Sequence, residues 1–594
     1  MPTFESYFDE EKILEVLCRY RVSKAQVFHE KRFHRKITHQ DKPEKPPLFY
    51  KYFPPRREWH KFRPKRRQRA GTHDHTLFSL LRTINWHKRK NSTQPWLQDL
   101  DNLISNIRRR VLSEHDFYFS SPKIRPELKK GNIYRAISSL ANIEDKVIDN
   151  LNAKYLRETL DPTFESCAVA FRGGASKHLN RNHAINQIVT FHQNNNQSPI
   201  YVTECDIRGF FDCVHHSVAK QALHRAEQLL KVRCPNVHLS MRSKEIFFAY
   251  LANYTFSKDV KQREHALKKM ENNPEAIYKW PVEQDTDSPG PYYLKYFHKK
   301  PSQAQIGIPQ GGAHSCLIAN LLLDLADKEV VLSLAREQEQ TLYLRFCDDI
   351  VIFTQTKESA ERSFNAYTSS LEHLKLPFHK ATNLNGYRKS SCSVKDERPR
   401  RAFFENSKTK VAFQWFYPHD YNHFPWVQFL GYQIHFNGKF RVRPSSIKKH
   451  KNKSIKLFKD LQDELLNNRR KISNKRVIYR FNCKVWAFTS GRVNIKTKHF
   501  TPLPMCWCNG FLQLAHHEYD KTQIASLDRH TGMLNRRLYR FLNRIGNQGG
   551  RSSNQDMEGN SEHLDFFGAP FSHQRQFSLE TSQDDTLPEE SNSI

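Results

Sequence analysis

Two adjacent carboxylates stand inside an apolar stretch of this 594-residue chain. Asp348 and Asp349 lie between two β-prone runs, residues 344–347 and 350–353, and Arg345 is the only local countercharge. Crowded carboxylates repel each other, and burial strengthens the repulsion. A hard cation such as Mg²⁺ takes oxygen ligands and lets neighbouring acids stay ionised. The pattern therefore indicates a metal site, with a solvated Asp-Asp turn between two strands as the alternative.

A second acidic segment favours the metal site. Residues 200–205 read as a strand that leads into Asp206, and Gly209 follows as a turn former. Between the two acidic segments, residues 305–320 form a Gly/Pro-rich loop that opens into an apolar helix, which suits close approach by a ligand backbone. Two-metal phosphoryl-transfer sites are usually built from strands that bring acids together from distant parts of a chain.

Strand geometry limits which acids can act together. Successive side chains on a strand point to opposite faces, so Asp348 and Asp349 share a site only if the chain turns between or beside them, as at a hairpin tip. We therefore expect Asp206 and Asp348 to be the main catalytic metal ligands, with Asp349 third.

These segments resemble, in the same order, the motifs of the reverse transcriptase family. Residues 206–212 resemble motif A, residues 307–312 motif B, and residues 346–349 the Tyr-X-Asp-Asp box, with Phe in place of Tyr. Residues 429–443 resemble the primer-grip hairpin, and residues 170–176 resemble a fingers motif of the bacterial branch. Within that branch, the chain is most similar to the defence-associated "unknown group" enzymes, related to retron and group II intron enzymes.

The resemblance implies an α+β, right-hand polymerase fold with an antiparallel-sheet palm and a helical thumb. The expected parts are a basic N-terminal extension over 1–120, fingers over 121–200, a palm over 201–445 with an insertion at about 256–304, a helical thumb region over 446–545 and a disordered acidic tail over 546–594. Residues 384–425 are expected to be irregular.

The resemblance also implies roles for single residues. Two Mg²⁺ ions, with Mn²⁺ as a substitute, would bind Asp206, Asp348, Asp349 and the backbone carbonyl of Ile207. The nucleotide-binding residues would be Arg172 as a triphosphate clamp, Phe211 as a barrier to a 2′-hydroxyl, Gln310 near the incoming nucleotide and Lys380 as a proton donor to pyrophosphate. The primer grip would include Phe429, Leu430 and Gly431. Phe211 as a core residue, Arg172 as a surface residue and His379 in place of Lys380 remain open alternatives.

Composition agrees with a polyanionic substrate. The chain has 95 Lys and Arg against 62 Asp and Glu, a net charge of +33, which favours phosphate contacts and counterion release. Charge does not indicate which nucleic acid is bound, but the resemblance implies a noncoding RNA template, a DNA product and deoxynucleoside triphosphates as ligands, and a partner protein or self-association. Without a leader, a membrane span or a paired cysteine framework, a cytoplasmic location is expected. Cys506 and Cys508, near His516 and His517, are too tightly spaced for the usual zinc site.

The sequence thus predicts an RNA-directed DNA polymerase, a magnesium-dependent nucleotidyltransferase, in bacterial antiviral defence. Three alternatives remain. The same site could extend DNA without a template or from a protein side chain, the chain could be a group II intron-like splicing cofactor, or it could be an RNA-binding scaffold without catalysis.

Overall fold

The computed structural model describes residues 3–38, 47–60, 75–195, 197–280, 300, 303–335, 340–383, 398–417, 423–467, 477–478, 481–482, 485, 492–494, 499–501 and 521–548. The chain forms two compact units. The first comprises Met1–Tyr20, Phe49–Pro54 and Ile84–Leu430, and the second comprises Arg21–Leu48, Pro55–Thr83 and Gly431–Ile594. The domain bounds expected from the sequence remain predictions.

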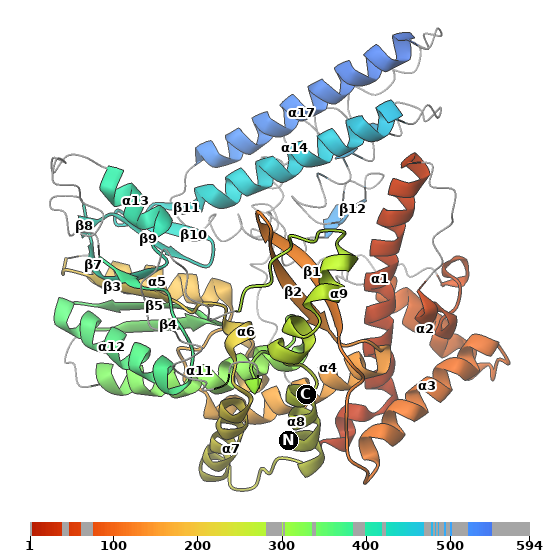
Figure 1. Ribbon diagram of the computed structural model, residues 1–594, viewed down its shortest axis with the longest axis horizontal. Coiled ribbons are helices and arrows are strands. Elements are labelled where there is room, and N and C mark those ends of the chain that lie inside the picture. The colour runs from red at the N-terminus through yellow and green to blue at the C-terminus, as the bar shows by residue number, and fades with distance from the viewer. Residues whose placement is uncertain are drawn as a thin grey trace, which may run out of the picture. The chain divides into compact units, whose positions relative to one another are not determined.

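A six-stranded sheet lies at the centre of the first unit (Figure 1). Its strands run in the order β4 (Leu342–Phe346), β5 (Asp349–Thr354), β3 (Tyr201–Asp206), β7 (Thr409–Trp415) and β6 (Ala381–Thr382), and β8 (His423–Phe424) also pairs with β7. The pairs β4–β5, β5–β3 and β3–β7 are antiparallel, whereas β6 and β8 run parallel to β7. The body of the sheet is therefore antiparallel, as expected.

Helices cover both faces of this sheet (Figure 1). On one face α12 (Lys357–His373) packs against β3, β5 and β7, and α11 (Ala313–Leu334) packs against α12. On the other face α5 (Arg181–Asn195) lies against Phe353 and Trp415. Burial on both faces explains why β5 reads as a continuous apolar run instead of an alternating one.

The other elements of the first unit are mainly helical. They are α3 (Pro95–Leu112), β1 (Lys123–Lys130), β2 (Ile133–Ser139), α4 (Ile143–Leu160), α6 (Phe210–Cys213), α7 (His216–Arg233), α8 (Met241–Ala252), α9 (Glu264–Met270), α13 (Arg398–Asn406) and β9 (Trp426–Phe429). The helix α4 packs against α11, α8 and α3, and so ties the N-terminal helices to the sheet layer. The helices α1 (Glu10–Thr38) and α2 (His75–Arg89) each continue from one unit into the other.

The second unit has its own core. Its helices α14 (Pro444–Asn467) and α17 (Lys521–Gln548) pack together, and Phe458, Leu534 and Leu538 are buried between them. The unit also contains the strands β10 (Tyr432–His435), β11 (Phe440–Val442), β12 (Arg492–Asn494) and β13 (His499–Thr501), paired as two antiparallel hairpins. Helices are thus present in the segment where a helical thumb was expected.

One expectation about an irregular segment needs correction. The described part of 384–425 is ordered, because Thr409–Trp415 forms β7 with Thr409, Phe413 and Trp415 buried. Within the segment expected as an insertion, Ile277 accepts a backbone hydrogen bond from Tyr134 of β2 at 2.9 Å, and the insertion itself remains a prediction. The expected tail over 546–594 begins inside α17, which ends at Gln548, and its residues 549–594 and the Cys506–His517 segment lie outside the described residues. None of the helices in the described ranges is both long and apolar enough to cross a membrane.

Candidate active site at the end of the central sheet

The paired acids lie at the tip of a tight hairpin. Phe346 of β4 pairs with Asp349 of β5, so Cys347 and Asp348 form a two-residue turn. Cys347 has a φ of +59°, the left-handed conformation that the common two-residue hairpin turns require. The hairpin tip that the shared site requires is therefore present.

The second acidic segment reaches the same end of the sheet. Asp206, the last residue of β3, stands directly opposite Asp349 in the antiparallel register. Burial raises the pKa of Asp348, and the negative charge of Asp206 raises it further. Asp206 and Asp348 are therefore electrostatically coupled carboxylates, whereas Asp349 is exposed.

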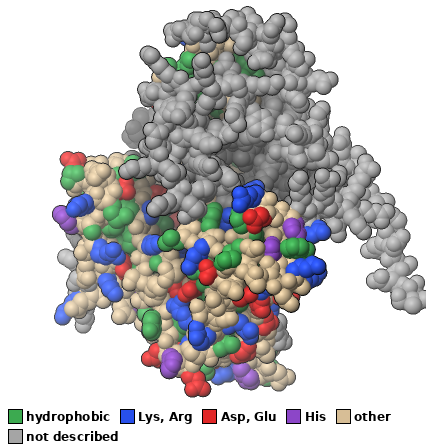
Figure 2. Space-filling model, turned by 90° about the vertical axis from the view of Figure 1, so that its right-hand side faces the viewer, with side chains coloured by type: hydrophobic (Ala, Val, Ile, Leu, Met, Phe, Trp, Pro, Cys, Tyr) green, Lys and Arg blue, Asp and Glu red, His purple; other side chains and the backbone are tan. Residues whose placement is uncertain are grey.

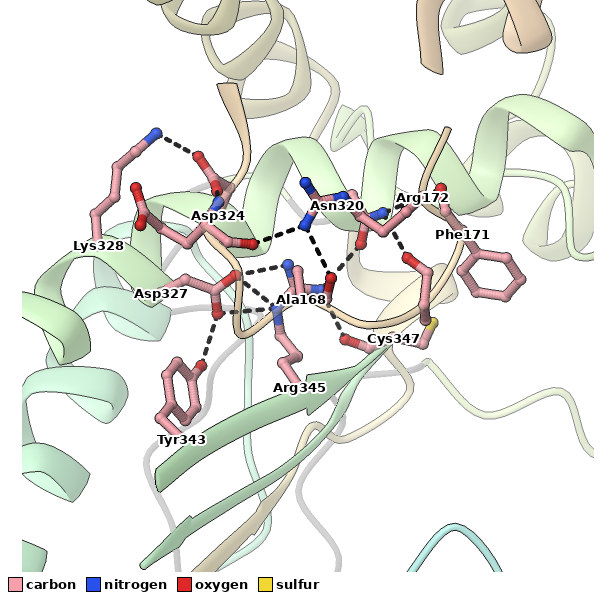
Figure 3. Close-up of polar contacts among 12 residues, drawn as sticks. Ala168, Phe171, Arg172, Asn320, Asp324, Asp327, Lys328, Tyr343, Arg345 and Cys347 are labelled. Atoms are coloured by element: carbon pink, nitrogen blue, oxygen red, sulfur yellow. Dashed lines mark hydrogen bonds and ion pairs between the residues drawn. The ribbon is translucent and has the colours of Figure 1, made fainter. Parts of the chain in front are cut away.

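A buried ion pair between Arg345 and Asp327 holds the turn in place (Figure 3). Arg345 Nε lies 2.8 Å from Asp327 Oδ2, its Nη2 lies 2.6 Å from the same oxygen, and neither side chain is exposed. Burial opposes the charge on Arg345, yet the Asp327 carboxylate outweighs it and raises the pKa. Arg345 Nη1 donates to the carbonyl of Cys347 at 3.1 Å. Arg345 thus positions the turn, and the Asp327 carboxylate neutralises most of the positive charge of Arg345.

Two basic side chains approach Asp206 from the segments that directly precede β6 and β7. Lys408 Nζ lies 3.5 Å from Asp206 Oδ2, and His379 Nε2 lies 4.0 Å from the same oxygen. The backbone N–H of His379 donates to the Asp206 carbonyl at 3.0 Å, which fixes this register. Burial and the charge of Lys408 lower the pKa of His379 to about 4. Lys380, the expected proton donor, is the exposed residue after His379.

The residues after Asp206 meet the Gly/Pro-rich loop. Phe210 is buried and Phe211 is half-buried in α6, and the role of Phe211 as a barrier to a 2′-hydroxyl remains a prediction. Gln310 Nε2 donates to Asp212 Oδ1 at 3.0 Å. Burial raises the pKa of Asp212 to about 6, although the Gln310 hydrogen bond opposes the shift. Ile207 directly follows Asp206 and forms an isolated bridge with Phe378, and its carbonyl as a metal ligand remains a prediction.

A hairpin adds further positive charge. Lys129 of β1 and Arg135 of β2 both act electrostatically on Asp212. Burial lowers the pKa of Lys129, and the charges of Arg135, Lys408 and Arg208 lower it further. Four basic groups are therefore close enough to interact. Lys129 and Lys408 are not recognisable as site residues from the sequence, because only the fold brings them near one another.

Arg172 uses its guanidinium on the protein itself. Its five N–H groups reach Asp161 Oδ1 at 2.8 Å, the carbonyls of Asp161, Glu165 and Ala168 at 2.8–3.1 Å, and Ser176 Oγ at 3.3 Å. Its side chain is 4% exposed. This geometry gives Arg172 a role in holding its loop, and a clamp on triphosphate would require these bonds to break. The clamp remains a prediction.

The expected primer-grip residues lie where the first unit ends. Phe429 is buried as the last residue of β9. Leu430 and Gly431 both have positive φ, +50° and +88°, so the chain turns sharply after β9. Their contact with a primer remains a prediction.

Asp206 and Asp348 are the candidate magnesium ligands of this site. Within the described ranges, no three His, Cys, Asp or Glu side chains gather to hold a metal ion. Magnesium in phosphoryl-transfer sites usually binds one or two carboxylates and completes its shell with water and substrate phosphates. Asp206 and Asp348, whose mutual repulsion a cation would relieve, fit that pattern.

No protein-family model and no curated protein matches this chain. Apo telomerase from Candida tropicalis, truncated from the C-terminal domain, aligns with a TM-score of 0.32 and 15% identity over 58% of this chain. Telomerase from Candida albicans, in complex with a TWJ fragment of telomeric RNA, aligns with a TM-score of 0.31 and 10% identity, covering 83% of this chain and 69% of that one. This chain covers 59% of the first structure's chain. Likeness at these TM-scores carries no weight for fold or function.

Proposed function

We propose that this protein is an RNA-directed DNA polymerase that adds deoxynucleotides to a nucleic-acid end. The observation that carries the proposal is the meeting of Asp206 and Asp348 at one end of an antiparallel sheet, with coupled charges. A right-hand arrangement of palm, fingers and thumb, a role in bacterial antiviral defence and a noncoding RNA template belong to the same proposal. These parts depend on the sequence resemblance alone.

Asp206 and Asp348 would hold Mg²⁺, with Asp349 and the Ile207 carbonyl as further ligands and Mn²⁺ as a substitute. When bound, the ions would activate the attacking hydroxyl and stabilise the leaving pyrophosphate. The buried Arg345–Asp327 pair keeps the turn in place, so the Asp348 carboxylate is preorganised.

The basic groups around the acids suit a triphosphate. Lys129, Arg135 and Lys408 form a concentration of positive charge, in which burial and the charges of Arg135 and Lys408 lower the pKa of Lys129. A polyphosphate ligand would relieve this repulsion, because its negative charges would pair with them. Lys408 has an exposed side chain whose Nζ lies 3.5 Å from Asp206 and 3.1 Å from His379, so it is a better-placed proton donor than Lys380.

Two residues would choose the nucleotide. Phe211 presents a partly exposed ring one residue before Asp212, where its bulk would exclude a 2′-hydroxyl. Gln310 is held by Asp212 and would line the same place. Replacement of Phe211 by Ala is expected to admit ribonucleotides, whereas replacement of the buried Phe210 would disturb the core instead.

Incorporation of labelled deoxynucleotides tests the proposal. Full-length protein is supplied with Mg²⁺ and deoxynucleotides, with and without RNA, beside the Asp348→Asn variant. Asp116→Asn, an exposed acid outside the site, is the matched control. RNA-dependent incorporation that Asp348→Asn abolishes and Asp116→Asn retains supports the proposal.

The same assay separates the alternatives. Incorporation without RNA indicates template-free synthesis, and label that stays on the protein after denaturation indicates a protein primer. If the wild-type protein binds RNA but incorporates no nucleotide, the polymerase assignment is wrong. A scaffold or a splicing cofactor is then the remaining interpretation.

A further inference from the structure

Phe171 has an unusual backbone conformation next to the candidate site. Its φ is +55°, in the left-handed region that residues with bulky side chains rarely adopt. Backbone strain of this kind persists only where the surrounding structure enforces it, and it concentrates at functional sites.

The neighbours of Phe171 enforce this conformation from both sides (Figure 3). Asn320 Nδ2 on α11 donates to the carbonyl of Ala170 at 2.9 Å, and it lies 3.5 Å from the carbonyl of Phe171 itself. On the other side, Arg172 is held by all five of its N–H groups, and the N–H of Gly173 donates to Asp161 Oδ1 at 2.9 Å. The loop is therefore rigid where the strained residue stands.

This strained residue presents an aromatic ring to solvent. The side chains before and after it, Ala170 and Arg172, are buried, whereas Phe171 is 38% exposed. In Figure 3 its ring points away from the polar network that holds the loop. A left-handed backbone and an exposed apolar ring each lower the stability of a fold, so neither feature is explained by a gain in folding stability.

The exposed ring lies beside the hairpin that carries Asp348. The loop lies alongside β4, because Val169 N donates to the Arg345 carbonyl at 2.9 Å. It thereby brings the Phe171 ring to 6.2 Å from the ring of Phe346, with an angle of 46° between the ring planes. Phe346 is itself half-buried and immediately precedes the turn. Two partly exposed aromatic faces therefore adjoin the acids.

We propose that Phe171 and Phe346 form an aromatic platform on which one base of the bound nucleic-acid strand stacks. The proposal rests on the proposed function and adds a specific contact to it. Stacking on aromatic rings tolerates any base, because every base has a flat π-face. A rigid, preorganised ring loses little conformational freedom on binding, so the strained backbone would favour binding of the base.

Binding of a fluorescent single-stranded oligonucleotide, followed by anisotropy, tests the platform. The full-length protein is titrated with an intact strand and with strands that carry an abasic site at successive positions. Phe171→Ala is expected to weaken binding of the intact strand about tenfold, the scale of one stacked base. It should have no effect on the strand that lacks a base at one particular position. Phe171→Trp should retain binding.

Two further variants serve as controls. Phe171→Gly removes the ring but suits a φ of +55°, so it should stay folded and bind like Phe171→Ala. Tyr118→Ala removes a ring that is 76% exposed elsewhere in the first unit, and should bind like the wild type.

Other outcomes would overturn the platform. Equal weakening for intact strands and for every abasic strand would mean that Phe171 acts on the fold or on phosphates. An unchanged strand affinity with a raised KM for deoxynucleotides would place the incoming nucleotide on the ring instead. Failure of the wild-type protein to incorporate nucleotides would overturn the proposed function, while the binding comparison would still decide the platform.

Discussion

The buried pair of Arg345 and Asp327 allows a quantitative prediction about stability. Both side chains are fully buried, and Asp327 accepts from Arg345 Nε and Nη2 within 2.9 Å. In Asp327→Asn the shape is kept, but the guanidinium becomes an uncompensated buried charge. Loss of one partner in such a pair destabilises a fold by about 3–5 kcal/mol. We expect Asp327→Asn to lower the free energy of unfolding by that amount.

The double variant Arg345→Met, Asp327→Leu gives the contrast. It leaves no charge behind, but it orphans the carbonyl of Cys347, Oδ1 of Asn320 and the hydroxyl of Tyr343, which now bond to the pair. Unsatisfied buried groups cost about 1–3 kcal/mol each at most, and small rearrangements relieve part of this. The double variant should therefore lose less stability than the two single variants combined.

Urea unfolding, monitored at two wavelengths to check for intermediates, measures these free energies. Glu361→Gln breaks an exposed pair with Lys357 and serves as the control, with an expected change below about 0.5 kcal/mol. If Asp327→Asn costs less than about 1 kcal/mol, or if the double variant costs the full sum, then the charge of Arg345 is not neutralised as the structure indicates.

Three further outcomes are expected. Burial raises the pKa of Asp212 to about 6 from an ordinary 3.8, so the folded protein holds this proton more tightly than the unfolded chain. Wild type should therefore lose thermal stability relative to Asp212→Asn as pH rises from about 4 to about 6, as melting curves would show. Lys408→Met removes a cation 3.5 Å from Asp206 and should tighten Mn²⁺ binding about two- to fivefold, measured by electron paramagnetic resonance. Phe171→Gly should be more stable than Phe171→Ala by about 1 kcal/mol in urea, because only glycine adopts its φ of +55° without strain.

Local patterns made part of the site predictable. The β-prone runs around Asp348 and Asp349 indicated two strands, and the requirement that both acids share a site implied a hairpin tip, which is present. The strand that ends in Asp206 was recognisable for the same reason. In each case the signal lay within about ten residues, where strand propensity and turn chemistry act directly.

Long-range partners were not predictable in this way. Arg345 was identified as a countercharge, but its partner Asp327 lies 18 residues earlier on a helix, where an acid among apolar residues gives no sign of what it faces. The strand β7 was missed inside a basic, proline-containing segment, although alternation at Thr409, Phe413 and Trp415 could have revealed it. Without β7, nothing in the sequence places Lys408 beside Asp206.

A shift of one residue changes which side chain reaches the site after β3. Lys380 was the expected proton donor, but the hydrogen bond from His379 N to the Asp206 carbonyl places the imidazole of His379 near the carboxylate. Adjacent residues in an extended segment point to opposite sides. This hydrogen bond therefore places the side chain of His379, and not that of Lys380, near the Asp206 carboxylate. Sequence motifs give the residue types at this position, whereas the register that selects one of them depends on a backbone contact between distant segments.

Arginine and lysine differ here for a related physical reason. The guanidinium of Arg172 has five donors in a rigid plane, which suits it to bind several carbonyls inside the protein, as it does. Lysine ammonium groups are strongly hydrated, and that of Lys408 remains exposed, 3.5 Å from Asp206 and 3.1 Å from His379. A charged residue type therefore indicates which chemistry is available, and burial decides whether the protein or the substrate uses it. For this site, we propose that Arg172 and Arg345 hold the framework, whereas Lys129 and Lys408, together with Arg135, meet the phosphates.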